Sequence, residues 1–275
     1  MFPVLLDFGV HNLPFFGETH LFIPTYGVLY AGGAVIAWIW LMRRARTLKV
    51  PDEHMFNLCF YGLLAGLLGA KLFLILVEWR YYLNNPMEIL GTIRSAGVLI
   101  GGVIAGAAVF IWYCRRHNLP TLTLADAFVA PLAVGQAVGR LGCFSAGCCY
   151  GSPTEGPLSV TFTDPVAAAQ TGVPLNIPLI PTQLTELTTD LLLAILLTFL
   201  WRKRVSPPGT VLWTYVLVYS CLRFLIEFGR GDDVRGLWFG GALSTSQILA
   251  LVAGLAAAAM LLRGRKQRAL ELNNG

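Results

Sequence analysis

Seven long apolar segments, separated by polar or turn-forming residues, constrain this chain more than any other feature. A helix of about 20 apolar residues crosses a bilayer, and only helices and closed barrels satisfy their backbone hydrogen bonds inside lipid. We expect spans at residues 25–42, 55–77, 97–113, 124–144, 185–200, 210–228 and 243–262. The sequence therefore predicts an all-α polytopic membrane protein with about seven transmembrane helices.

The composition fits this fold class. Hydrophobic residues make up 56% of the chain and charged residues only 13%, against about 25% charged residues in a soluble domain. We expect a single integral membrane domain over residues 1–275. Residues 145–181 are rich in Pro, Thr and Gly and are expected to form a small extracytoplasmic loop insertion, with a short strand at residues 158–162. Residues 1–23 precede the first span and are expected to lie on the membrane surface.

Basic residues gather at the end of every second span. They are Arg43, Arg44, Arg46, Lys49, Arg115, Arg116, Arg202, Lys203, Arg204, Arg263, Arg265, Lys266 and Arg268. Cytoplasmic ends of spans carry an excess of Lys and Arg, so this pattern predicts the N-terminus outside and the C-terminus in the cytoplasm. The net charge of +5 then reflects topology, and we expect no nucleic-acid partner.

Other charges lie near the opposite, outer ends of the spans. A charge at the centre of a membrane helix costs about 2.5–3.5 kcal/mol on insertion scales, so it is rarely present for packing alone. The residues are Lys71, Arg140, Glu186, Asp190, Arg223, Glu227 and Arg230. On one helix Gln136, Arg140 and Cys143 share a face, because residues at i, i+4 and i+7 are neighbours.

Arg223, Glu227 and Arg230 repeat the same spacing on another helix. Two arginines and two carboxylates at one depth predict a site for an anionic head group, because guanidinium groups bind phosphate in a bidentate manner. A structural interpretation stays open, in which Arg140 and Arg223 only form ion pairs with Glu186 or Glu227. Lys71 also has a simple alternative, extension of its amine to the interface.

Seven short motifs, in order along the chain, resemble one bacterial family. They are TYGVL (25–29), GLLGAK (66–71), GGVIAG (101–106), GQAVGRLG (135–142), PTQLTE (181–186), RFLIEF (223–228) with Arg230, and LSTSQI (243–248). Together they resemble the phosphatidylglycerol–prolipoprotein diacylglyceryl transferases. The family has seven spans with the N-terminus outside, which agrees with the topology expected from the charges.

The resemblance implies a reaction in the bacterial cytoplasmic (inner) membrane. The diacylglyceryl group of phosphatidylglycerol moves to the thiol of a lipobox cysteine in the signal-peptide region of a preprolipoprotein. A thioether forms and glycerol phosphate leaves. The implied partners are therefore phosphatidylglycerol, the preprolipoprotein and membrane lipids, with the active site towards the outer leaflet. No cofactor and no metal is expected.

The resemblance also assigns roles to residues. Arg140 and Arg223 match the essential arginines of the family and suit the stabilisation of a departing phosphate. Glu186 and Glu227 match its glutamates, which orient the arginines or help to take the thiol proton. These four are the expected catalytic residues. The expected substrate-binding residues are Tyr26, Gln136, Lys71, Arg230 and Gln183.

The chain departs from the family pattern at several positions. The best-known members carry a histidine where this chain has Ile100. They also carry asparagines and an acidic residue near the positions of Cys143, Ala146 and Cys148. All four histidines lie outside the expected spans, at His11, His20, His54 and His117. The departures leave open a divergent enzyme with a carboxylate base, a paralogue that acts on another acceptor, or a paralogue that has lost the activity.

Three of the six cysteines, Cys143, Cys148 and Cys149, cluster beyond the fourth span. A disulfide is compatible with an oxidising compartment, whereas zinc needs a fourth ligand that the sequence does not identify. A redox-active thiol would make the protein a membrane thiol oxidoreductase, and small residues that pack closely are the simplest interpretation. A carrier or channel is disfavoured, because a pathway needs polar residues on both sides of the midplane. Asp126 is expected to cap its own helix in a Thr-x-x-Asp box.

Overall fold

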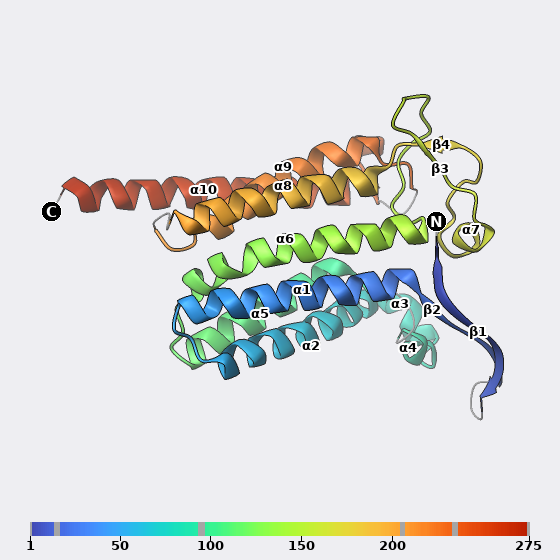
Figure 1. Ribbon diagram of the computed structural model, residues 1–275, viewed down its shortest axis with the longest axis horizontal. Helices are drawn as coiled ribbons and strands as arrows, with labels where there is room; N and C mark the ends of the chain where they lie inside the picture. The colour runs from blue at the N-terminus through green and yellow to red at the C-terminus, as the bar shows by residue number, and fades with distance from the viewer. Residues whose placement is uncertain (1, 14–16, 93–96, 204–206, 233–235, 274–275) are drawn as a thin grey trace. The chain divides into compact units, whose positions relative to one another are not determined.

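The computed structural model describes residues 2–13, 17–92, 97–203, 207–232 and 236–273 of the chain. Most of this part is helical (Figure 1), and seven of the described helices are long and apolar enough to cross a membrane. This confirms the expected all-α polytopic fold.

The seven long helices begin and end close to the expected positions. They are α1 (Thr25–Thr47), α2 (Asp52–Val77), α5 (Leu99–Arg116), α6 (Thr121–Ala146), α8 (Thr182–Arg202), α9 (Thr210–Ile226) and α10 (Thr245–Asn273). Most extend past the apolar segment, because backbone hydrogen bonding continues after the side chains become polar. Arg204, predicted to belong to a basic cluster, lies outside the described residues.

Shorter elements connect the long helices. They are α3 (Trp79–Asn84), α4 (Glu88–Gly91), α7 (Pro165–Thr171), the 3₁₀ turns η1 (Glu227–Gly229) and η2 (Phe239–Gly241), and the strands β3 (Val160–Thr161), β4 (Pro178–Leu179), β5 (Leu237–Trp238) and β6 (Leu243–Ser244). β3 pairs with β4 and β5 with β6, both antiparallel. β3 lies within the strand predicted at residues 158–162.

The segment before the first span forms a β-hairpin, which the sequence analysis did not predict. β1 (Val4–Leu13) pairs antiparallel with β2 (Gly17–Pro24). The register shifts along β1, and Gly9 within it has a positive φ of 80°. These irregularities break the strict alternation of polar and apolar residues that identifies a strand in a sequence.

The chain divides into two compact units, which we describe separately. One contains Met1–Trp40 and Ala125–Gly275, and the other contains Leu41–Leu124. The expected single domain over residues 1–275 stays a prediction.

In the second unit, α2 and α5 pack closely through small residues (Figure 1). A Cβ atom on Gly69 would lie 2.4 Å from the Cβ of Ala105, and one on Gly101 would lie 2.2 Å from the Cβ of Phe73. Only glycine fits at such positions, as in small-residue packing between membrane helices generally. The glycine-rich motifs of these two helices therefore serve helix packing.

The first unit has its apolar core where α6, α8 and α9 meet. Val129 and Ala133 of α6 pack there with Leu193 and Leu197 of α8 and with Val211 of α9. α10 lies along α9 (Figure 1). These contacts fix the ends of α6, α8 and α9, which carry ionic residues described below, and the start of α10, which carries Ser246.

Asp126 corrects one prediction. It lies inside α6, is buried, and accepts hydrogen bonds from the backbone N–H groups of Gly209 and Leu212, both at 2.7 Å. Asp126 therefore caps the start of α9, a helix more than 80 residues away, and not its own helix. The expected box was wrong because α6 begins at Thr121, which places Asp126 in its second turn.

Asp126→Ala is expected to lower the free energy of unfolding by about 1–3 kcal/mol, because one buried and one partly buried N–H donor lose their acceptor. Asp126→Asn keeps one acceptor and should lose less. Thermal unfolding in detergent micelles measures both variants. Asp164 caps α7 from an exposed position, so Asp164→Ala is the matched control with a smaller expected loss. An unchanged unfolding midpoint in Asp126→Ala would contradict the assigned cap.

Candidate active site

Glu186 is the centre of the ionic cluster in the first unit. It lies one turn into α8, and its carboxylate forms ion pairs with two arginines from different helices. One oxygen, Oε2, pairs with Nε of Arg140 near the end of α6, and the other, Oε1, accepts from Nη1 of Arg223 at 3.2 Å. A single carboxylate thus holds both predicted arginines in one place.

Arg223 has further partners on its other amino group. Its Nη2 lies 2.7 Å from Oε2 of Glu227, at i+4, and 3.3 Å from the hydroxyl oxygen of Ser246 at the start of α10. The expected i, i+4 relation of Arg223 and Glu227 is confirmed. Ser246 was not among the predicted site residues, because a hydroxyl at a helix start is usually a local cap.

The cluster is buried. The side chain of Glu186 is 7% exposed and that of Arg223 is 13% exposed, whereas the side chain of Arg140 is 20% exposed. Buried charges cost several kcal/mol each unless they are paired and hydrogen bonded. The four residues Arg140, Glu186, Arg223 and Glu227 balance in charge, so the pairing offsets this cost.

Arg140 is the arginine that keeps donors for a ligand. Among the described residues, its ion pair with Glu186 is made through Nε alone, and no protein acceptor engages its two Nη groups. A guanidinium held through one edge presents the rest of its planar fork to an incoming anion. Arg140 is therefore oriented by Glu186 and still able to bind two phosphate oxygens.

Gln136 lies one turn before Arg140, as the spacing predicts. Its Oε1 accepts a hydrogen bond of 2.7 Å from the hydroxyl of Tyr215 on α9. This bond joins α6 to α9 one helical turn away from Arg140. A contact between Gln136 and substrate stays a prediction.

Arg230 does not share a helical face with Arg223, and that prediction was wrong. α9 ends at Ile226, the 3₁₀ turn η1 follows, and Arg230 itself has extended backbone angles. Its side chain pairs with Asp232, with Nε donating to Oδ1 at 2.8 Å. Its backbone meets the loop after α6, where the hydroxyl of Ser152 donates to the carbonyl of Arg230 at 3.1 Å.

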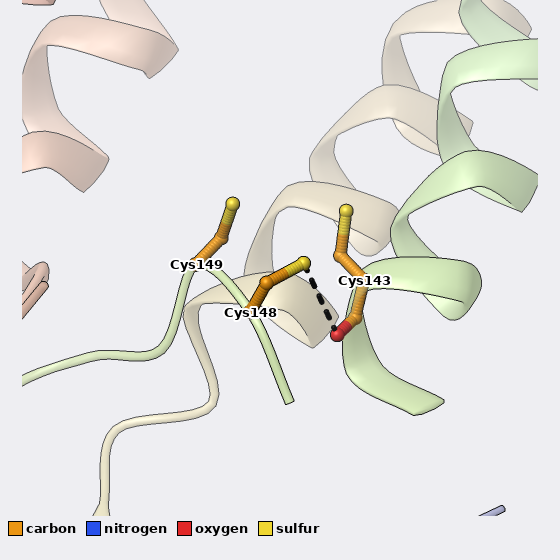
Figure 2. Close-up of side chains that lie close together, drawn as sticks. All are labelled: Cys143, Cys148 and Cys149. Atoms are coloured by element: carbon orange, nitrogen blue, oxygen red, sulfur yellow. Dashed lines mark hydrogen bonds between the residues drawn. The ribbon is translucent and has the colours of Figure 1, made fainter. Parts of the chain in front are cut away.

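The three clustered cysteines come together in space (Figure 2). Cys143 lies in the last turn of α6, while Cys148 and Cys149 lie in the loop that follows. Their sulfur atoms lie within 4.8 Å of one another, and all six cysteines of the chain are free thiols. The three residues are partly buried.

Local backbone geometry turns these cysteines toward one another. Gly147 ends the helix with a φ of +80°, and Cys149 has a φ of +59°, which a residue with a Cβ rarely adopts. The backbone N–H of Cys148 donates to the carbonyl of Cys143 at 3.2 Å, and its Sγ lies 3.7 Å from the same oxygen. A tight turn therefore brings positions 143 and 148 together.

Two buried side chains at the start of α8 hold this turn in place. The Thr182 hydroxyl donates to the carbonyl of Cys149 at 2.6 Å, and the Gln183 amide donates to the carbonyl of Cys148 at 2.8 Å. Gly151 fixes the exit, because a Cβ there would lie 2.4 Å from the carbonyl oxygen of Ile180. The amide nitrogen of Gln183, predicted to bind substrate, is thus used to position the cysteine loop.

The charges of the site act on the thiols outside the helix. Hydrogen bonds from the Cys143 and Cys148 thiols lower the pKa of Cys149, and the nearby positive charges of Arg230 and Arg140 lower it further. Hydrogen bonding to Cys143 and Cys149, together with burial, raises the pKa of Cys148. Of the two loop cysteines, Cys149 is therefore the one more readily present as thiolate.

The remaining predicted residues are less tightly linked to the cluster. Tyr26 opens α1, stacks on Tyr30, and lies against Gly142 of α6. Lys71 belongs to the other compact unit, where its amine donates to the carbonyl of Thr92. Substrate binding by Tyr26 and Lys71 stays a prediction.

None of the four histidines joins the ionic cluster. His11 and His20 lie in the β-hairpin, and His54 and His117 pack against Tyr113 in the second unit. His54 lies inside α2, because that helix begins at Asp52 and not at residue 55 as expected. The described ion pairs of the cluster are made by arginine and glutamate side chains.

The fold and the site together define a multi-pass membrane protein with a buried arginine–glutamate cluster at one end of four helices and three thiols beside it. The chain belongs to the prolipoprotein diacylglyceryl transferase family, since the model of that family matches residues 15–263. The resemblance of its motifs is thereby confirmed, and the protein is a transferase of a bacterial family in a membrane.

Relatives with curated names agree with this assignment. A phosphatidylglycerol–prolipoprotein diacylglyceryl transferase of Clostridium tetani is 38% identical over 226 residues, covering 82% of this chain and 87% of the relative. A second, from Clostridium perfringens, is 30% identical over 229 residues, covering 83% and 86%. A third, from Dehalococcoides mccartyi, is 31% identical over 258 residues, covering 92% and 94%.

Proposed function

We propose that the protein transfers the diacylglyceryl group of phosphatidylglycerol to the lipobox cysteine thiol of preprolipoproteins and releases glycerol phosphate. The bond between the glyceryl carbon and the phosphate oxygen breaks, and a carbon–sulfur bond forms. The thiol loses its proton, and the oxygen stays with the departing phosphate.

The donor groups left on Arg140 carry this proposal. A guanidinium anchored through Nε by Glu186 offers both Nη groups to the phosphate, whose negative charge grows as it leaves. Donors that are fixed before the reaction stabilise such charge most effectively. Arg223, held by Glu186, Glu227 and Ser246, adds a second positive charge beside it.

Glu186 and Glu227 have an orienting role in this scheme. Each is ion-paired with arginine, and each pair fixes the position of a guanidinium group. We assign them to positioning the arginines. Tyr26, Gln136, Lys71, Arg230 and Gln183 remain proposed contacts to the lipid head group, to the peptide or to the surrounding loop.

The charge pattern indicates which side of the membrane the site faces. The basic ends of α1, α5, α8 and α10 are cytoplasmic under the positive-inside rule, so the ionic cluster at the other end of α8 faces the outer leaflet. We place the protein in the bacterial cytoplasmic membrane, where the signal-peptide region of a secreted preprolipoprotein meets that leaflet.

The test uses the purified full-length protein in detergent micelles with phosphatidylglycerol and a peptide that carries a lipobox cysteine. Mass spectrometry of the peptide and the release of glycerol phosphate are followed together. We expect a diacylglyceryl mass gain matched by equal glycerol phosphate, and no gain for a peptide with serine in place of the cysteine. Folded protein that binds phosphatidylglycerol but modifies no lipobox peptide would overturn the proposal in favour of another acceptor.

A further inference from the structure

The three converging thiols form a ligand set that the ionic cluster does not use. Cys143, Cys148 and Cys149 present their sulfur atoms to one small space (Figure 2), within 4.8 Å of one another. Zn–S bonds of about 2.3 Å at tetrahedral angles place neighbouring sulfurs about 3.8 Å apart. Small rotations of side chains would therefore bring the three sulfurs to the separations of a zinc site.

The number of ligands distinguishes between kinds of zinc site. Among the described residues, no fourth His, Cys, Asp or Glu belongs to this group. Structural zinc sites in proteins are closed by four protein ligands, whereas catalytic sites have three and keep one position for water or substrate. A set of three thiols therefore has the composition of a catalytic site.

The surroundings favour a site of net negative charge. Three thiolates around Zn²⁺ carry one negative charge, and a fourth thiolate would raise this to two. Arg140 lies one turn before Cys143 on α6, and the segment after Cys149 pairs with Arg230 through Gly151. Two guanidinium groups held near the thiols in this way favour negative charge there, as cations do around thiolates in general.

The backbone is organised around the same three residues. Cys149 keeps a left-handed conformation with a φ of +59°, which is unfavourable for a residue with a Cβ. Thr182 and Gln183, both buried, hold the two adjacent carbonyls. Strain of this kind persists where the surrounding structure fixes it, typically at a functional site.

The proposed reaction needs a deprotonated acceptor thiol, and a bound zinc ion would supply one. The acceptor must be a thiolate to act as a nucleophile. Both carboxylates of the cluster are paired with arginines. A thiol that binds a metal ion loses its proton outright.

We propose that Cys143, Cys148 and Cys149 bind one Zn²⁺ ion as three thiolates, and that the substrate cysteine takes the fourth position as it is alkylated. The inference rests on the proposed function. The incoming thiol replaces water, releases its proton to solvent, and gives its sulfur electron pair to the glyceryl carbon. The carbon–oxygen bond breaks, glycerol phosphate leaves with its oxygen, and the neutral thioether dissociates from zinc. Zinc undergoes no redox change. This revises the expectation of no metal.

The first experiment measures metal content and needs no activity. Full-length protein purified without chelator is analysed by inductively coupled plasma mass spectrometry, and we expect about one zinc per chain. Cys143→Ser, Cys148→Ser and Cys149→Ser should each lower zinc occupancy at least tenfold. Cys148→Asp replaces the sulfur ligand with a carboxylate oxygen, so it should retain more zinc than Cys148→Ser. Cys59→Ser and Cys221→Ser, which change cysteines outside the cluster, are the matched controls and should keep full occupancy.

The second experiment asks whether the substrate thiol reaches the metal. In protein loaded with Co²⁺, sulfur ligation gives a charge-transfer absorption band. We expect this band to strengthen by about a third when a lipobox peptide adds a fourth sulfur, and to stay unchanged with the serine peptide. Size-exclusion profiles and thermal unfolding identify any variant that fails to fold, and the comparison of Cys148→Asp with Cys148→Ser then decides the role of that ligand.

Several outcomes would overturn the inference. They are wild-type protein without zinc, protein that holds copper or iron instead, a mass loss that reveals a disulfide among the three cysteines, or zinc that persists in all three serine variants. A cobalt spectrum unchanged by the peptide would overturn the substrate-ligand step. Full transfer activity in zinc-free protein would overturn the inference and leave the proposed function standing. Zinc-loaded protein that transfers nothing would refute the proposed function instead.

Discussion

Arg140→Ala is expected to lower kcat/KM for diacylglyceryl transfer by about a hundredfold to a thousandfold, the usual loss when one preorganised donor to a developing anion is removed. Arg140→Lys should recover little of this loss. The single ammonium nitrogen of lysine cannot both pair with Glu186 and present a planar pair of donors to the phosphate. Steady-state release of glycerol phosphate from phosphatidylglycerol measures both variants.

The controls distinguish a loss of catalysis from the effects of a changed net charge or of misfolding. Arg46 forms an exposed ion pair with Asp52, and Arg46→Ala removes the same kind of side chain from an exposed position, so its activity should stay within about twofold of wild type. Lipid binding and the thermal unfolding midpoint are recorded for each protein. Folded Arg140→Lys with wild-type kcat/KM would contradict the bidentate role of Arg140.

Glu186→Ala is expected to cause the largest loss of stability. The change leaves two buried guanidinium groups without their shared carboxylate, and breaking a buried ion pair by removing one partner costs about 3–5 kcal/mol. Transfer should also fall, because Arg140 loses the contact that orients it. Unfolding in detergent micelles measures stability, and glycerol phosphate release measures transfer.

A double-mutant cycle tests the same bridge more sharply. Because Glu186→Ala leaves Arg140 unpaired, the double change Arg140→Ala with Glu186→Ala should cost less stability than the sum of the two single changes. Exposed Glu53 at the start of α2 is the control, and Glu53→Ala should change stability by less than about 0.5 kcal/mol. Additive losses at Arg140 and Glu186 would show that the two side chains are not coupled.

The proposed zinc site and the ionic cluster act on different parts of the proposed reaction. Arg140 and Arg223 act on the phosphate that leaves, while the three thiolates act on the sulfur that attacks. Cys143 follows Arg140 by three residues on the same helix, so one turn of α6 contributes to both tasks. This arrangement predicts that zinc loss and Arg140→Ala impair transfer by separate routes, the first through the nucleophile and the second through the leaving group.

The sequence by itself determined the features that depend on local order along the chain. Seven apolar segments predict seven membrane helices because each must satisfy its own backbone hydrogen bonds. The pair Arg223 and Glu227 follows from helical periodicity alone. The motifs were sufficient to indicate the family, since several in one order are far more specific than one.

Only the tertiary structure decided which distant residues meet. Glu186 bridges Arg140 and Arg223 because the core between α6, α8 and α9 brings three helix ends together, and no spacing along the chain encodes that contact. Arg230 does not lie on the helical face expected for it, because the helix ends at Ile226. The cysteines converge because Thr182 and Gln183 hold their loop through its carbonyl groups. Hydrogen bonds and packing over long sequence separations are fixed by the whole fold, whereas periodicity reports only the neighbours within a few turns.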